Sequence, residues 1–218
     1  MRYRTYLFDF DGTLVDSMPV YISLMLRILD EHKIPYGSDI IKTITPMGFV
    51  GGASYFISMG LDLPHDQLVA LMRQRAYDEY AFRIPAKPHV ISTLRELKAR
   101  GCDLNVLTAS PHTTLDPCLK RLGIYDLFTH VWSCEDFQTT KADPRIYDMA
   151  AQQIGMPKAD ILFLDDNFNA DLSAKNAGMA VCGVYDASSA EYEDEIKAIA
   201  DHYIHDFSEL LKSKPLVN

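Results

Sequence analysis

Short apolar runs alternate with segments of helical periodicity along most of the chain, and this alternation limits the possible fold more than any other feature. The helical segments include residues 90–101, 113–123 and 145–155, where apolar residues recur at helical spacing. Strands that alternate with helices pair in parallel, and a parallel sheet needs helices on both faces. The pattern therefore predicts an α/β protein with a doubly wound parallel sheet. The expected strands are 5–10, 103–110, 129–133, 160–166 and 179–185.

One region interrupts this alternation, because residues 16–85 contain helical patterns only. The first helix of this region is expected over residues 17–32. Its predicted apolar face consists of Met18, Ile22, Met25 and Leu29. We therefore expect two domains, an α/β core formed by residues 1–15 and 86–218 and a helical cap formed by residues 16–85, inserted after the first strand.

Acidic residues stand where two of the expected strands end. Asp9 and Asp11 follow the first apolar run, and residues two apart on a strand face the same side, so their carboxylates are expected to share a pocket. Asp165 and Asp166 follow the apolar run ILFL. The carboxyl ends of parallel strands meet at the edge of the sheet where ligands bind. Because close carboxylates are costly unless they are protonated or bound to metal, the sequence predicts a cation between them.

Four pieces fall in order at successive strand ends: DFDGT at 9–13, TAS at 108–110, Lys141, and the pair Asp165-Asp166. In this order the chain resembles the haloacid dehalogenase-like hydrolase superfamily, in the capped branch (subfamily IA) that contains phosphoglycolate phosphatases and β-phosphoglucomutases. The resemblance covers nearly the whole chain. It implies a Rossmann-like core and an enzyme, a phosphoric monoester hydrolase that acts on a small-molecule phosphate ester through an aspartyl-phosphate.

The acid pair after the first strand has the chemistry that such a reaction needs. A carboxylate can attack phosphorus and divide one difficult hydrolysis into two easier transfers, and Asp9, nearest the strand, is the candidate nucleophile. Asp11 is the candidate general acid, which would protonate the leaving oxygen and later act as base toward water. In the dehalogenases of the family the position of Asp11 is not acidic. Its presence here favours phosphoryl transfer over carbon–halogen cleavage.

The predicted cation is Mg²⁺, which prefers oxygen ligands and keeps several waters. Asp9, the backbone carbonyl of Asp11, and Asp166 are the expected ligands. By resemblance, Asp166 aligns with the direct metal ligand and Asp165 with its neighbour, which often supports the site without binding the metal. The later acid of this family motif falls at Ala170, and Asp171 is displaced by one residue. Whether Asp171 contributes to the metal site is left open.

The phosphate side of the site is expected at Thr108, Ala109, Lys141 and Gly12. A threonine hydroxyl and backbone N–H groups at the start of the next helix can hold phosphate oxygens. A lysine can offset the charge of the phosphoryl group and of the nucleophile. Gly12 would let the turn approach the ligand closely.

Two alternatives to a phosphatase are considered. A sugar phosphomutase of the β-phosphoglucomutase type needs a cation in the cap for a distal phosphate. Residues 43–56 contain no Lys or Arg, but Lys42 directly precedes them and the cap also contains Arg27, Arg73, Arg75 and Arg83, so this alternative stays open. A receiver-like regulatory module also combines an acid cluster with a phosphoryl-accepting aspartate, a hydroxyl and a lysine. In a receiver the acid pair follows the first strand and the acceptor comes later, which is not the order found here.

The charge of the chain bears on its partners and location. The formal net charge of −9, without a block of basic residues, argues against nucleic acid and anionic membranes as partners. No apolar run is long enough to cross a bilayer, no secretory cleavage pattern follows the N-terminus, and four widely spaced cysteines indicate reduced thiols. We therefore expect a cytoplasmic protein. The identity of the phosphate ester and the oligomeric state stay undetermined.

Overall fold

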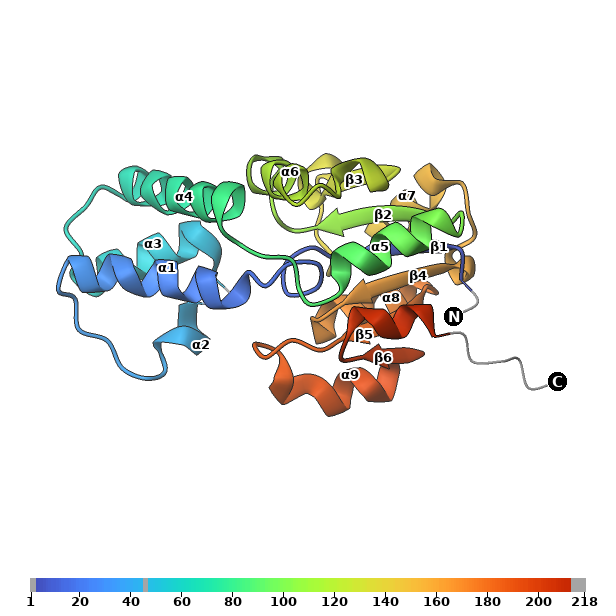
Figure 1. Cartoon of the computed structure of the whole chain (residues 1–218). Helices are drawn as coiled ribbons and strands as arrows, with labels where there is room; N and C mark the ends of the chain where they lie inside the picture. Colours follow the sequence, from blue (N-terminus) through green and yellow to red (C-terminus); the bar gives the residue numbers. More distant parts are fainter. Residues whose placement is uncertain (1–2, 45–46, 213–218) are drawn as a thin grey trace. The chain divides into compact units, whose positions relative to one another are not determined.

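The computed structural model describes residues 3–44 and 47–212, apart from the side chain of Lys42. Lys42, the residue on which the mutase alternative could be tested, thus lies outside the described side chains. The described chain forms two compact units, Met1–Asp16 with Pro85–Asn218 and Ser17–Ile84, to the extent that their residues are described (Figure 1).

A parallel sheet of six strands, in the order β3-β2-β1-β4-β5-β6, forms the centre of the first unit. Every neighbouring pair in this sheet is parallel. The order starts at the central β1 and runs outward in both directions, as in a doubly wound sheet. The predicted α/β class is thereby confirmed. The strands are β1 (Thr5–Phe8), β2 (Asp103–Thr108), β3 (His130–Ser133), β4 (Ile161–Asp165), β5 (Ala180–Val184) and β6 (His202–Ile204).

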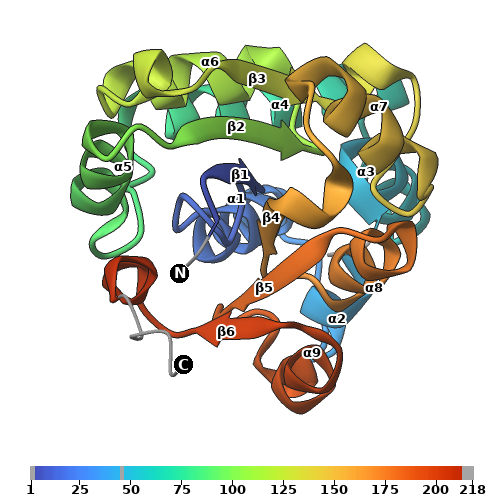
Figure 2. The ribbon, with the colours of Figure 1, turned by 90° about the vertical axis from the view of Figure 1, so that its right-hand side faces the viewer.

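Helices cover both faces of this sheet. Figure 2 shows α5 on one side of the sheet and α7, α8 and α9 on the other. The α-helices of the unit are α5 (Val90–Ala99), α6 (His112–Arg121), α7 (Arg145–Ile154), α8 (Phe168–Ala177) and α9 (Glu193–Ile199). Short 3₁₀ helices are η2 (Tyr125–Leu127), η3 (Cys134–Phe137), η4 (Lys158–Asp160), η5 (Ala190–Tyr192) and η6 (Phe207–Leu211).

The central strands are buried along their whole length, which explains why they appear in the sequence as continuous apolar runs. Every residue of β1 and of β4 is buried. One face packs Leu7 and Phe163 of the sheet against Ile146 of α7 and Ala174 of α8. The core therefore lies directly beneath the carboxyl ends of β1 and β4, where the predicted acids stand.

The edge strand β6 was not among the predicted strands. It has only three residues, and His202 and Tyr203 are half-buried while Ile204 is buried. A short edge strand with polar residues carries almost no periodic signal, although it pairs with β5 through residues such as Gly183 and Tyr203.

The second unit consists of α1 (Met18–Glu31), α2 (Ile40–Ile44), α3 (Gly48–Ser58) and α4 (His65–Phe82). The predicted apolar face of α1 is partly wrong. Met25 and Leu29 are buried as expected, but the other buried residues of α1 are Leu24 and Ile28 rather than Met18 and Ile22. The face is rotated because α1 packs against α4 and also meets α3, where a Cβ on Gly52 would lie 2.5 Å from Met25 Cε.

Within the first unit, the chain segments that lead into and out of the helical region run side by side. The N–H of Asp16 donates to the carbonyl of Pro85 at 3.0 Å, and Val15 and Ala86 form an antiparallel bridge. The segment that returns to the sheet is thus fastened to the turn after β1 at the point where it re-enters the core.

Two further expectations concern features outside the site. The four cysteines are buried free thiols, as predicted. Within residues 3–44 and 47–212, none of the helices combines the length and the apolar character that a membrane span requires.

Candidate active site

Three buried acids converge at the carboxyl ends of β1 and β4. The parallel register sets Phe8 beside Leu164, and the N–H of Asp9 donates to the carbonyl of Leu164 at 2.8 Å. Asp9 and Asp165 therefore leave neighbouring strands at the same level. One carboxylate oxygen from each of Asp9, Asp165 and Asp166 lies within 4.8 Å of the other two. The three residues are only 4%, 0% and 7% exposed, in that order.

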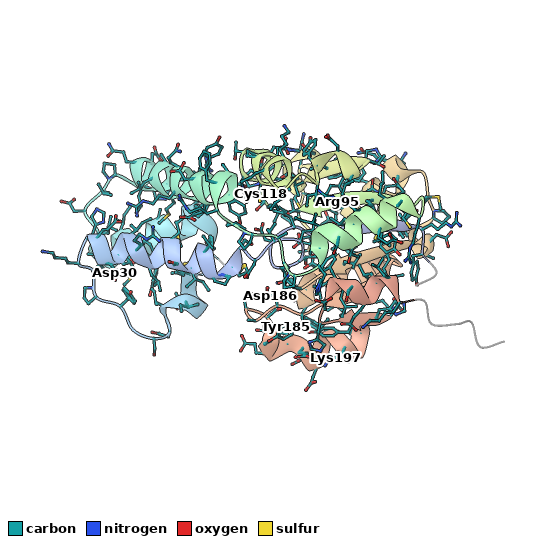
Figure 3. All side chains as sticks on the ribbon, in the orientation of Figure 1. Asp30, Arg95, Cys118, Tyr185, Asp186 and Lys197 are labelled. Carbon is teal, nitrogen blue, oxygen red and sulfur yellow. The ribbon has the colours of Figure 1, made fainter. Side chains whose placement is uncertain are left out.

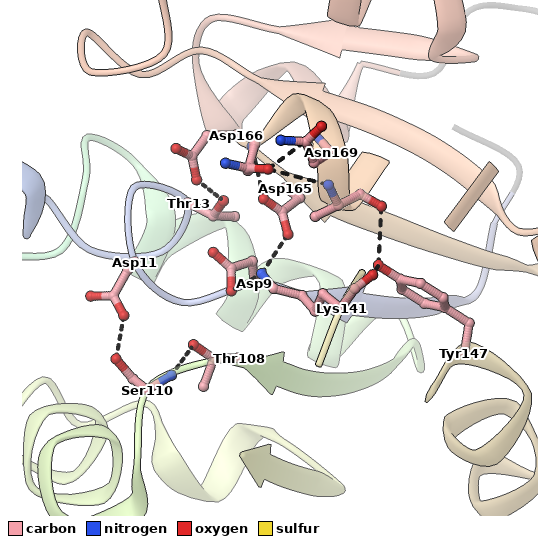
Figure 4. Close-up of polar contacts among 12 residues, drawn as sticks. Asp9, Asp11, Thr13, Thr108, Ser110, Lys141, Tyr147, Asp165, Asp166 and Asn169 are labelled. Atoms are coloured by element: carbon pink, nitrogen blue, oxygen red, sulfur yellow. Dashed lines mark hydrogen bonds and ion pairs between the residues drawn. The ribbon is translucent and has the colours of Figure 1, made fainter. Parts of the chain in front are cut away.

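Lys141 lies against this acid cluster, defined as Asp9, Asp165 and Asp166. Its Nζ lies 2.6 Å from Asp9 Oδ1 and 2.6 Å from Asp165 Oδ2, and its side chain is 13% exposed (Figure 4). Tyr147 holds the backbone behind it, because the phenol donates to the carbonyls of Lys141 and Ala170 at 3.1 and 3.0 Å. One ammonium group thus pairs with two carboxylates of this three-acid cluster in a buried position.

The pKa values of Asp9 and Asp166 reflect burial first and neighbouring charge second. Burial raises the pKa of Asp9 from 3.8 to about 7. The attraction to Lys141 lowers this pKa, whereas the repulsion from Asp165 raises it further. Burial, followed by the charges of Asp165 and Asp9, raises the pKa of Asp166 well above its usual range. Burial opposes the charge on Lys141, but the carboxylates of Asp165 and Asp9 raise its pKa.

The donor set of the acid cluster fits a metal ion. All its groups are carboxylate oxygens, which hard divalent cations prefer as ligands. The three buried carboxylates outnumber the ammonium group beside them, that of Lys141. Such a cation would offset the repulsion that, after burial, raises the pKa of Asp9 and Asp166. The three acids could thus hold a metal ion together, and the assignment of Asp9 and Asp166 as its ligands stays a prediction.

Asp11 does not join the acid cluster. Its Oδ2 accepts a hydrogen bond from Ser110 Oγ at 2.5 Å, so the carboxylate points toward the segment that follows β2 (Figure 4). The expectation that both acids face the same way assumed strand geometry, but β1 ends at Phe8 and the chain turns through Gly12, whose φ is +72°. The side-chain alternation of a strand does not extend through such a turn.

The turn after β1 depends on glycine at position 12. A Cβ there would lie 2.5 Å from Asp166 Oδ2, too close for any other residue. The next residue, Thr13, donates from Oγ1 to Asp166 Oδ1 at 3.1 Å. Gly12 therefore brings the turn into contact with the acid cluster, while its predicted contact with phosphate stays a prediction.

Thr108 and Ala109 lie at the carboxyl end of β2. Thr108 is buried, and its Oγ1 accepts a hydrogen bond from the N–H of Ser110 at 3.1 Å. Ala109 is exposed, and α6 begins three residues later at His112. Ser110 thus connects Thr108 to Asp11. In the sequence, only its place in the TAS stretch indicates its hydroxyl.

Asp171 is not one of the three acids of the cluster, although it is close enough to feel their charge. It is fully buried on α8, and neither carboxylate oxygen has a hydrogen-bond partner in the described part of the chain. Burial, then the charges of Asp165 and Asp166, raises its pKa well above the usual range. The capping residue of the same helix is Asn167, whose Oδ1 accepts from the N–H groups of Asn169 and Ala170.

Known proteins share both the sequence pattern and the fold. A sequence model of the haloacid dehalogenase-like hydrolases matches residues 3–178. The pyrophosphatase PpaX of Bacillus velezensis is 29% identical over 184 residues, which cover 84% of this chain and 83% of that protein. The phosphoglycolate phosphatase of Salmonella typhi is 28% identical over 207 residues, which cover 83% of this chain and 81% of that protein.

The crystal structure of CbbY from Rhodobacter sphaeroides in complex with phosphate superposes with a TM-score of 0.78 at 20% identity. The superposition covers 95% of this chain and 96% of CbbY. At this identity the likeness concerns the fold, and it agrees with the six-stranded parallel sheet described above.

Proposed function

The chain belongs to the haloacid dehalogenase-like hydrolase family, and we propose that it hydrolyses a small phosphomonoester with the help of Mg²⁺. The observation that carries the proposal is the convergence of three buried carboxylates at the carboxyl edge of the sheet, two of which lie 2.6 Å from Lys141 Nζ. A purely structural ion pair would need only one carboxylate for the ammonium group, so the excess of buried acids favours a binding site. Membership of a hydrolase family also favours an enzyme over a receiver-like module.

In the first step, a carboxylate oxygen of Asp9 attacks phosphorus and the ester P–O bond breaks. The leaving oxygen takes a proton from Asp11, which lies outside the acid cluster beside Ser110. This step yields the free alcohol and an acyl phosphate on Asp9. Thr108 and Lys141, with the N–H groups near Ala109, would hold the phosphoryl oxygens.

In the second step, water attacks the phosphorus of the acyl phosphate and gives a proton to Asp11. The bond between Asp9 and phosphorus breaks, inorganic phosphate leaves, and both aspartates return to their starting states. Mg²⁺ held by Asp9, Asp166 and the carbonyl of Asp11 would supply positive charge to the phosphoryl group. Asp165 would support that site by its contact with Lys141 and by accepting from the N–H of Asn167 at 2.8 Å.

The names of the relatives suggest which substrates to test. Phosphoglycolate and pyrophosphate belong in the panel because two relatives are named for hydrolysing them. Sugar phosphates and nucleotides complete it, since the described residues do not identify the leaving group. A part for the helical unit in choosing that group stays a prediction.

The test is phosphate release from this panel by the whole chain, with Mg²⁺ and with a chelator. We expect release that needs the metal and that Asp9→Asn abolishes while the variant stays folded. Release that persists in the chelator or in Asp9→Asn would contradict the proposal. A mutase would instead convert a sugar monophosphate in the presence of its bisphosphate and release little phosphate.

A further inference from the structure

Lys87 lies at the centre of a hydrogen-bonded junction that the reaction above does not use. Its Nζ donates to the carbonyl of Gly12 at 2.6 Å, to the carbonyl of Tyr185 at 2.6 Å and to Asp186 Oδ2 at 2.9 Å. The side chain is 14% exposed, and Tyr185 and Asp186 follow β5 (Figure 3). An ammonium group has three donors, so all of them are engaged inside the first unit.

The backbone around Lys87 is fastened to the same turn. The N–H of Lys87 donates to the carbonyl of Leu14 at 3.0 Å, next to the bridge between Ala86 and Val15. The segment that returns from the helical region therefore holds the turn after β1 with its backbone and with the Lys87 side chain. Two attachments of this kind fix the turn more firmly than either alone.

The carbonyl of Gly12 is the contact that matters for chemistry. Gly12 directly follows Asp11, and a glycine backbone has more rotational freedom than any other. Its N–H donates to the carbonyl of Val15 at 3.0 Å, and Lys87 holds its buried carbonyl. With both polar groups of Gly12 fixed, the backbone that carries Asp11 has one available orientation.

Asp186 keeps the Lys87 ammonium in place. Its other oxygen, Oδ1, accepts from the N–H of Ser188 at 2.9 Å and from Ser188 Oγ at 2.6 Å. Asp186 is 6% exposed, so removal of Lys87 would leave a buried carboxylate without its cation. The junction thus connects the loop after β5 to the turn after β1 through a single side chain.

We propose that Lys87 is a positioning residue, which by holding the Gly12 carbonyl keeps the Asp11 carboxylate where it can protonate the leaving oxygen. This inference rests on the proposed phosphatase function. It assigns Lys87 no contact with substrate or metal. Its effect on kcat/KM must therefore be largest where the leaving oxygen needs the proton of Asp11.

The test compares two substrates that differ in their need for that acid. An alkyl phosphate must have its leaving oxygen protonated, whereas p-nitrophenolate leaves without a proton. The constant to compare is kcat/KM, because it reports only the steps up to the acyl phosphate. We expect Lys87→Met to lower kcat/KM about ten- to a hundredfold for the alkyl phosphate and less than about threefold for p-nitrophenyl phosphate. Equal losses on both substrates would overturn the inference.

A double-mutant cycle with Asp11→Asn tests whether Lys87 acts through Asp11. In the Asp11→Asn background, Lys87→Met should lower kcat/KM for the alkyl phosphate less than about threefold. The same fold-loss in both backgrounds would overturn the inference. The matched control is Lys175→Met, which removes another lysine–aspartate pair of the same unit, to Asp201, and should leave both substrates unchanged.

The remaining controls separate misfolding and inactivity from the inference itself. Thermal unfolding shows whether each variant is folded at the assay temperature. If Lys87→Met does not fold, Lys87→Gln takes its place. Its amide can still donate to a carbonyl, so we expect a smaller loss of kcat/KM that is again greater for the alkyl phosphate than for p-nitrophenyl phosphate. An inactive wild type would refute the proposed function, whereas an active wild type with equal losses in the variants would refute only the role of Lys87.

Discussion

Replacing Asp9 by asparagine should abolish turnover and yet stabilise the metal-free protein at neutral and alkaline pH. The carboxylate is 4% exposed, and its pKa rises from 3.8 to about 7 because of burial and the nearby Asp165 charge. Between these pH values the folded protein keeps a proton that the unfolded chain releases. The free energy of unfolding therefore falls as pH rises from about 4 to about 7. A shift of about three pKa units corresponds to about 4 kcal/mol.

The assay is urea unfolding at pH 4 and pH 8, in the presence of a chelator, followed by circular dichroism. The difference between Asp9→Asn and wild type should grow by about 4 kcal/mol from the lower to the higher pH. Asp62→Asn, which changes an exposed aspartate in the helical unit, serves as the control and should show no such change. A difference between Asp9→Asn and wild type that is the same at both pH values would refute the assignment of Asp9 to a buried, self-repelling cluster.

Three further substitutions test other parts of the site. Asp171→Leu should raise the free energy of unfolding at pH 8 by about 1–3 kcal/mol in a urea titration, because it removes a buried carboxylate without a partner among the described residues; a loss of stability would show that this group is paired. Gly12→Ala should destroy activity and cost about 1–3 kcal/mol of stability by thermal unfolding, since its Cβ meets Asp166 at a positive φ; an active, equally stable variant would contradict this. Lys141→Met in chelator at pH 8 should cost about 3–5 kcal/mol of stability in urea, and a neutral effect would mean that the lysine does not offset the acid cluster.

Much of the core could be predicted because one physical pattern determines both the fold and the place of the site. Strands buried on both faces appear as continuous apolar runs, as in β1 and β4, and the residues just beyond them must lie at one edge of the sheet. The sequence pattern alone therefore predicts that Asp9, Asp165 and Asp166 lie together, as they do in the structure. β6 was not predicted, because three residues at the edge of a sheet give no periodic signal in the sequence.

The details of the site depend on contacts that no periodicity encodes. The carboxylate of Asp11 turns toward Ser110 because β1 ends at Phe8, so that Asp11 already lies outside strand geometry, directly before the turn at Gly12. Lys87 contacts Gly12, which lies 75 positions earlier in the sequence. A single lysine between two prolines gives no sequence pattern that would predict this contact. Asp171 stands one residue after the position of the family's later acid. Its surroundings depend on how α8 packs, which the sequence pattern does not encode.

The central claim is that Asp9 forms a covalent bond to phosphorus, and the most direct measurement is mass spectrometry of the protein after reaction with substrate. Asp11→Asn should lack the base that hydrolyses the intermediate, so a reactive ester such as p-nitrophenyl phosphate with Mg²⁺ should leave a phosphoryl group on the peptide that contains Asp9. The account predicts this peptide in Asp11→Asn, its absence in Asp9→Asn, and its loss when a chelator is present. Phosphate release by the wild type, without any phosphoryl group on Asp9 in the trapping variant, would contradict it.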